Sequence, residues 1–119
     1  MCIRDRHDRF GKAGKDSIGC WAQTEPDHGS DSIAFAQPYF SDKSIRPNCI
    51  AKRDGDDYVI SGQKAAWVSC GTVASVALLM CAIDGEPGFA GSGAFIVPLD
   101  LPGVTKLSLI HISEPTRPY

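Results

Sequence analysis

The chain has 119 residues, of which 43% are hydrophobic and 22% charged, and its formal net charge is −2. A chain of this size buries one modest core, and the composition is that of a globular domain rather than of a disordered, collagen-like or coiled-coil protein. The scattered basic residues argue against a nucleic-acid or anionic-membrane surface, and no stretch is long enough to span a membrane. Because the N-terminus lacks the apolar middle of a secretory signal, we expect a cytoplasmic protein.

The two ends of the chain read as sequence of another origin. One allowed coding of residues 1–6, ATG TGT ATA AGA GAC AG, has the reverse complement CTG TCT CTT ATA CAC AT, which encodes LSLIH, the start of residues 107–119. This word resembles the transposon end used to prepare sequencing libraries, and the following SEPTRP resembles the adjoining adapter. We therefore interpret residues 1–6 and 107–119 as non-native tails derived from an adapter.

The interior of the chain reads as a series of short strands. Residues 7–18 are polar and punctuated by glycine, which suits a loop or the frayed end of a truncated element. Apolar runs bounded by Gly, Pro and Asp then predict strands at residues 19–24, 48–53, 58–62, 65–71, 75–83 and 93–98. Strands at this spacing predict an all-β sandwich or barrel.

Two of these strands carry further information. Residues 75–83 are apolar almost throughout, which suits a strand buried on both faces, and the turn DGEPG after them favours a strand over a buried helix. Residues 48–53 and 58–62 are joined by DGDD, whose Asp-Gly core supplies the positive dihedral angles of a tight hairpin. We expect its acidic residues to be solvated.

The five cysteines do not predict a metal site. They form no C-x-x-C pair and have no histidine at ligand spacing. Cys81 lies in an apolar run and is expected to be a small buried hydrophobe, whereas Cys70 is retained as a candidate for a functional role. The full set is Cys2, Cys20, Cys49, Cys70 and Cys81.

The bend TEPDHGSD, residues 24–31, concentrates hydrogen-bonding groups directly after the first strand. Pro26 forces the chain to turn, and Gly29 in a left-handed conformation would aim successive N–H groups into an anion-binding nest. Ser30 and Thr24 would add hydroxyls, and His28 is expected to be an exposed turn residue. The alternative is an Asx-type turn whose side chains satisfy their own backbone.

The segment GQKAAWVSCG, residues 62–71, offers an aromatic plane beside a hydroxyl. Trp67 and Ser69 are two residues apart and would share one face of a strand, where they could contact a flat heterocycle. The alternative is a tryptophan in the core beside a surface serine.

In order and spacing, TEPDHGSD, DGDDYVISGQKAAWVSCG and GAFIVPLDLPGV resemble the middle β-domain of the acyl-CoA dehydrogenases. The resemblance covers nearly all of residues 19–104. It implies a β-domain over 19–106, preceded at 7–18 by a linker or the end of a helical N-terminal domain, and a helical C-terminal bundle that this chain lacks. It also implies FAD, an acyl-CoA substrate, electron-transfer flavoprotein or a similar acceptor, and a homo-oligomer.

The resemblance also assigns roles to residues. Thr24 would bond the pyrimidine end of the flavin, Ser30 would contact the pyrophosphate or the pantetheine arm of the substrate, and Trp67 would pack on the isoalloxazine. Ser69 would lie near flavin N5, where fixed donors stabilise the charge that reduction creates. The cofactor-binding set is Trp21, Ala22, Gln23, Thr24, Gly29, Ser30, Trp67, Val68 and Ser69, and Ser30 is also assigned to the substrate.

Two positions depart from the family pattern. The family usually places its Lys and Trp two residues apart, whereas Lys64 and Trp67 are three apart. In a regular strand this would move Lys64 to the opposite face unless a bulge absorbs the extra residue, so the assignment of Trp67 does not depend on Lys64. In addition, Cys70 replaces the usual Asn.

The reaction implied is removal of the substrate α-proton by a carboxylate, with hydride transfer to the flavin. We assign no catalytic residue to this chain, because the family places that carboxylate in the C-terminal bundle. The chain is then a fragment that alone neither dehydrogenates acyl-CoA nor holds FAD tightly. Two alternatives are a fragment of a flavin monooxygenase or nitroalkane-type oxidase of the same fold, and a non-enzymatic β-sandwich binding module.

Overall fold

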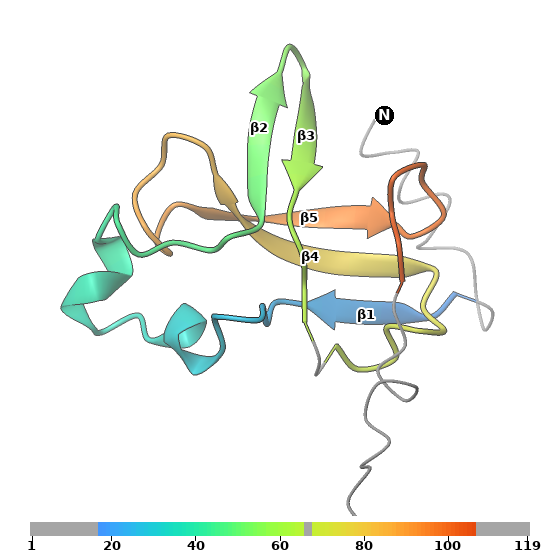
Figure 1. Ribbon diagram of the computed structural model, residues 1–119, viewed down its shortest axis with the longest axis horizontal. Coiled ribbons are helices and arrows are strands. Elements are labelled where there is room, and N and C mark those ends of the chain that lie inside the picture. Colours follow the sequence, from blue (N-terminus) through green and yellow to red (C-terminus); the bar gives the residue numbers. More distant parts are fainter. Residues whose placement is uncertain (1–16, 66–67, 107–119) are drawn as a thin grey trace, which may run out of the picture.

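The computed structural model describes residues 17–65 and 68–106, which form one mixed five-stranded sheet (Figure 1). The strands are β1 (Gly19–Ala22), β2 (Ile50–Asp54), β3 (Asp57–Ser61), β4 (Val76–Ile83) and β5 (Ser92–Pro98). Within these two ranges the only helices are single 3-10 turns, η3 (Ser30–Ile33) and η4 (Pro38–Ser41), and neither could cross a membrane. The predicted all-β class is confirmed.

Strand β4 is the centre of the sheet. Along one edge it pairs antiparallel with β5, from Val76↔Pro98 to Ala82↔Ser92. Along the other edge its first half pairs parallel with β1 and its last residues pair parallel with β2. The β2–β3 hairpin therefore leaves the sheet beyond the end of β1 and projects from it (Figure 1).

The core between these strands consists mainly of small side chains. In β1, exposed and buried residues alternate, as expected of a strand with one covered face. One cluster joins Cys20 and Ala22 to residues of β4 and the loop before it, and a second joins Cys49, Ala51 and Cys81. Cys81 is fully buried, which confirms its expected role as a small hydrophobe.

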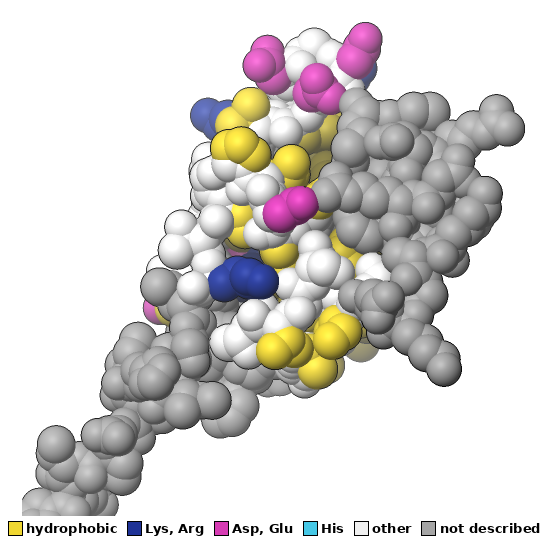
Figure 2. All heavy atoms as spheres, turned by 90° about the vertical axis from the view of Figure 1, so that its right-hand side faces the viewer, with side chains coloured by type: hydrophobic (Ala, Val, Ile, Leu, Met, Phe, Trp, Pro, Cys, Tyr) yellow, Lys and Arg dark blue, Asp and Glu magenta, His cyan; other side chains and the backbone are white. Residues whose placement is uncertain are grey.

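The β2–β3 hairpin has the predicted form. Gly55 adopts φ = +61°, and the turn joins Asp54 to Asp57 in antiparallel register. Asp54, Asp56 and Asp57 are exposed, and acidic side chains gather at the hairpin tip at the top of Figure 2. This confirms the expected solvated acidic turn.

The strand predicted over residues 65–71 is wrong. Its described part forms turns, in which the Gly71 N–H bonds the Val68 carbonyl at 3.0 Å and Cys70 adopts φ = +61°. A left-handed residue interrupts the alternation of a strand, so Ser69 does not lie on a strand face. Trp67 lies outside the described residues.

Gly62 is required where the chain leaves β3. It has φ = +142°, and a Cβ there would lie 2.5 Å from the Cys49 Cα. We expect Gly62→Ala to lower the free energy of unfolding in urea by about 2–4 kcal/mol, through backbone strain and overpacking. Gly55→Ala is the matched control, because Gly55 also has positive φ but no atom lies within 4 Å of an added Cβ. We expect this variant to lose about 1 kcal/mol of unfolding free energy. Equal losses in both variants would contradict the steric argument.

Candidate functional site

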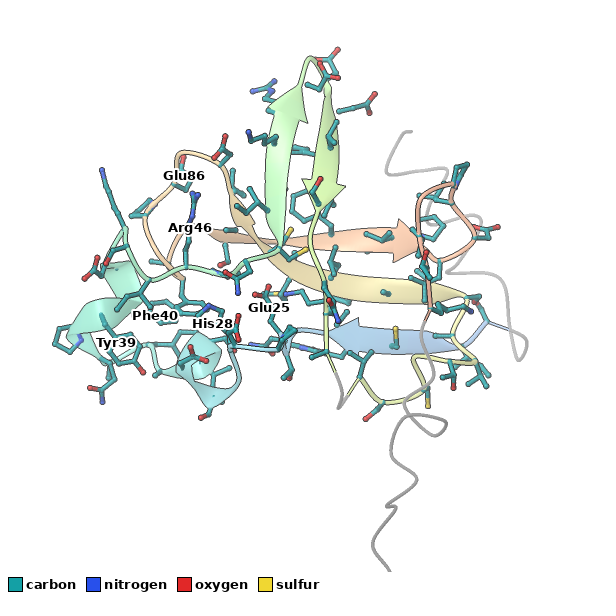
Figure 3. All side chains as sticks on the ribbon, in the orientation of Figure 1. Glu25, His28, Tyr39, Phe40, Arg46 and Glu86 are labelled. Carbon is teal, nitrogen blue, oxygen red and sulfur yellow. The ribbon has the colours of Figure 1, made fainter. Side chains whose placement is uncertain are left out.

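Glu25 joins three segments of the chain just past the end of β1 (Figure 3). It is 2% exposed, so its charge is buried. Its carboxylate accepts hydrogen bonds from the N–H groups of Asn48 (2.6 Å) and Cys49 (3.0 Å), which lead into β2. Lys64 follows β3 in the chain, and its ammonium donates a third hydrogen bond to the Glu25 carboxylate at 2.8 Å. The bend, the entry to β2 and the exit from β3 are thereby fixed to one another.

Lys64 and Ala65 also bond the backbone of the bend. The Lys64 ammonium donates to the Gln23 carbonyl at 3.0 Å, across 41 residues of sequence, and the Ala65 N–H donates to the Thr24 carbonyl at 2.9 Å. The two segments singled out in the sequence therefore meet directly. Lys64 does not lie on an opposite strand face, because residues 62–65 are not in a strand and the two-residue alternation does not apply.

The outer side of the bend carries a chain of side-chain hydrogen bonds. The indole N–H of Trp21 donates to Gln23 Oε1 (2.8 Å), and Gln23 Nε2 donates to Ser32 Oγ (3.0 Å). Ser32 Oγ in turn donates to the Gly29 carbonyl (2.7 Å). Trp21 is nevertheless 57% exposed, so its ring is anchored at one edge and open on its surface.

The predicted anion-binding nest at Gly29 is wrong. Gly29 adopts φ = −133°, outside the left-handed region. The Asp31 carboxylate accepts the N–H groups of Gly29 (2.7 Å) and Ser32 (3.0 Å), so the donors expected to face an anion are bonded within the turn. This agrees with the alternative of a turn whose side chains satisfy their own backbone. Ser30 is exposed beside it.

His28 supports the same turn and is not the exposed residue expected. Its Nδ1 lies 2.7 Å from Asp31 Oδ2, and its ring meets Phe89 edge to face at 5.2 Å. Burial by itself would raise the pKa of the Asp31 carboxyl, but the hydrogen bonds from His28, Gly29 and Ser32 outweigh it, and the pKa is lowered from 3.8. The turn is therefore held by an ionised carboxylate.

A hollow of about 420 Å³ lies beside the bend, within the size range of small-molecule sites. Aromatic and other apolar side chains dominate its wall, and polar groups of the bend enter it. Its lining includes Trp21, Gln23, His28, Phe40, Met80 and Phe89. Phe40 stacks on Phe89 at 6.0 Å, so the segment with the two 3-10 turns, to which the sequence assigned no element, closes one side.

Two buried thiols, Cys49 and Cys81, belong to the core cluster whose Cys49 N–H bonds Glu25. The hydrogen bond between Cys49 and Cys81, followed by burial, raises the pKa of Cys81 above its usual 9.0. We infer that Cys81 stays a neutral thiol. Among residues 17–65 and 68–106, no group of His, Cys, Asp and Glu side chains could hold a metal ion.

Residues after Trp67 face both the core and the solvent. Val68 is half-buried and packs against the cluster that contains Cys20 and Ala22, while Ser69 and Cys70 are exposed. The methyl group of Ala22 is also in this core, so a cofactor could reach Ala22 only through its backbone.

The structure thus brings together Trp21, Gln23 and Thr24 with residues 64–65. Sequence reasoning missed Lys64 and Asp31 as parts of this arrangement. Asp31 bonds backward to the Gly29 N–H, whereas the side chain of an Asx-type turn bonds the backbone that follows it, so the Asx pattern alone does not predict this contact. No local signal pointed to Lys64, because its partners lie about 40 positions earlier in the sequence.

The effects of substituting Glu25 and Lys64 on the free energy of unfolding should be strongly non-additive. Both side chains are over 90% buried, so Lys64→Met leaves a buried carboxylate without its cation and should lower the free energy of unfolding by about 3–5 kcal/mol. Adding Glu25→Gln to Lys64→Met should restore part of that loss. Urea unfolding of the wild type, the two single variants and the double variant gives the coupling energy. The matched control is Asp84→Asn, which loosens exposed pairs at 3.8 and 4.0 Å and should change stability by less than about 1 kcal/mol. Additive effects of the two buried substitutions would contradict the coupling.

The turn held by Asp31 should loosen in acid. A carboxyl whose folded pKa is lowered contributes stability above its unfolded pKa, and this is lost as pH falls through the folded value. The unfolding free energy of the wild-type chain should therefore fall more steeply below the ordinary value of 3.8 than that of Asp31→Asn. Urea midpoints measured across the acid range test this, and identical pH dependence would show that the carboxylate contributes nothing.

Comparison with known protein families matches residues 20–111 to the middle domain of acyl-CoA dehydrogenases. Bovine mitochondrial short-chain specific acyl-CoA dehydrogenase is 37% identical over 90 residues, which are 76% of this chain and 19% of that protein. A cyclohex-1-ene-1-carbonyl-CoA dehydrogenase of Geobacter metallireducens is 37% identical over 83 residues, which are 70% of this chain and 18% of that protein.

Solved structures give the same result. A probable acyl-CoA dehydrogenase from Mycobacterium abscessus matches with a TM-score of 0.61 and 29% identity, over 83% of this chain and 22% of that one. A glutaryl-CoA dehydrogenase from Mycobacterium smegmatis, in complex with FADH2, matches with a TM-score of 0.53 and 36% identity, over 74% of this chain and 18% of that one. The chain spans about a fifth of the length of these relatives. By its sequence and its sheet, it belongs to the acyl-CoA dehydrogenase family, of which it represents the middle β-domain.

Proposed function

We propose that the chain supplies the flavin-facing wall of a FAD-dependent dehydrogenase that oxidises the α,β bond of an acyl-CoA thioester. The observation that carries this proposal is the direct bonding of residues 64–65 to Gln23, Thr24 and Glu25. It joins the two motif segments that the family resemblance assigns to the cofactor. The glutaryl-CoA dehydrogenase with a similar fold holds FADH2, which supports FAD as the cofactor.

The residues at this junction fit a flavin. Thr24 is half-buried with its carbonyl bonded to Ala65, so its hydroxyl and its backbone N–H are proposed as donors to the pyrimidine end. Trp21, earlier in the same segment, offers an open aromatic surface anchored through Gln23. Ser30 and Ser69 are exposed hydroxyls assigned to the pyrophosphate or pantetheine and to the N5 edge. FAD when bound would supply the hydride acceptor, and the protein groups would hold it and stabilise its charge.

The catalytic base is proposed to lie in another part of the full-length protein. Glu25 is engaged by three donors, and Asp54, Asp56 and Asp57 lie at the hairpin tip, away from the bend. By the same proposal, this chain alone neither turns over acyl-CoA nor retains FAD. Electron-transfer flavoprotein or a similar acceptor, and self-association of the full-length enzyme, belong to the proposal as well.

The test is flavin binding by the full-length protein encoded at the source locus. It should purify with FAD, and addition of acyl-CoA without oxygen should bleach the flavin absorption. Thr24→Val keeps the shape but removes a hydroxyl donor, so FAD should dissociate about three- to tenfold more readily, as expected for one hydrogen bond. Thr72→Val, on the exposed turn before β4, is the matched control and should bind as wild type does. A full-length protein that binds no FAD would overturn the proposal.

A further inference from the structure

We propose that Lys64 is a positioning residue for the flavin, which acts by fixing the orientation of the peptide between Gln23 and Thr24. This inference rests on the proposed function and adds to it a residue outside the predicted cofactor set. The Lys64 ammonium donates to the Gln23 carbonyl at 3.0 Å. The carbonyl and the N–H of a trans peptide point in opposite directions. The bond that fixes the Gln23 carbonyl therefore also directs the Thr24 N–H away from the ammonium.

The next peptide is fixed from the same segment. The Ala65 N–H donates to the Thr24 carbonyl at 2.9 Å. The peptides on both sides of Thr24 are thus held by two consecutive residues of one chain segment. Thr24 is the residue assigned to the pyrimidine end of the flavin, so its backbone N–H is held in place before any ligand binds.

Lys64 is itself held rigidly. Its side chain is 9% exposed and its ammonium lies 2.8 Å from Glu25 Oε1. Glu25 is in turn bonded to the N–H groups of Asn48 and Cys49 at the start of β2. A lysine at the surface would lose this fixed geometry to side-chain entropy and solvent. Here Glu25 and the sheet position Lys64, and Lys64 positions the Thr24 peptide.

This arrangement has a consequence for redox chemistry. Reduction places negative charge on the pyrimidine end of a flavin, and a donor that is already oriented stabilises this charge without reorganisation. Without Lys64, the peptide between Gln23 and Thr24 can turn, and the donor is no longer fixed. We therefore expect Lys64 to strengthen FAD binding and to raise the reduction potential of bound FAD.

The experiment uses the full-length FAD protein and separates positioning from stability. Glu25→Gln removes the ion pair but leaves the bond from Lys64 to the Gln23 carbonyl. Glu25→Gln combined with Lys64→Met removes that bond as well, in a background without an unpaired buried carboxylate. We expect the double variant to bind FAD about tenfold more weakly than Glu25→Gln and to have a lower flavin reduction potential. Lys52→Met, which removes an exposed lysine of β2, should match wild type in both measurements.

The outcomes test the role of Lys64 and the flavin assignment separately. A lower reduction potential in the double variant than in both Glu25→Gln and the wild type supports positioning, because the double variant and the wild type carry the same net charge at this pair and a loss of stability alone does not move the potential of the folded, flavin-bound protein. Equal FAD dissociation constants and equal potentials in these two variants would overturn the role of Lys64 while leaving the flavin assignment intact. A wild-type protein without FAD would overturn the proposed function itself, and this inference with it.

Discussion

The arrangement of the site depends on one buried carboxylate. Glu25 is enclosed by donors from the start of β2 and from the segment after β3, and these donors come from parts of the chain 23 to 39 residues away. A buried charge is tolerated only while its partners are in place. The three segments therefore cannot separate individually without exposing or orphaning the charge, which makes their association cooperative.

This polar junction complements an unusual core. Most of the buried apolar side chains are alanines and cysteines, and Phe89 is the one large residue among the buried hydrophobics of the described ranges. Small side chains bury less apolar area each, so the hydrophobic contribution per residue is modest. Specific hydrogen bonds then determine how the loops sit on the sheet.

Local sequence patterns predicted the strands but not how they pair. The runs at 19–24, 48–53, 58–62, 75–83 and 93–98 each correspond to a strand, and Asp-Gly chemistry predicted the hairpin, because these features depend on neighbouring residues. The parallel pairing of β1 with β4 has no local signature. The nest predicted at Gly29 fails because Asp31 competes for the N–H groups of the turn. The strand predicted over residues 65–71 fails because apolar content alone does not reveal the left-handed Cys70. Strand alternation does not apply to Lys64, because its segment is not a strand.

The parallel pairing of β1 with β4 also determines the order in which the strands can pair while the chain is being translated. Ser75 bonds the Ile18 carbonyl across 57 residues, at the start of that pairing. Contacts between residues so distant close a large loop, and such loops form more slowly than a local hairpin. On the ribosome, β2 and β3 can join as soon as they emerge, whereas β1 has no partner in the sheet until β4 has been translated. The apolar edge of β1, with Trp21 on its open face, is thus exposed to chaperones and to other chains for most of the time that the domain takes to be made.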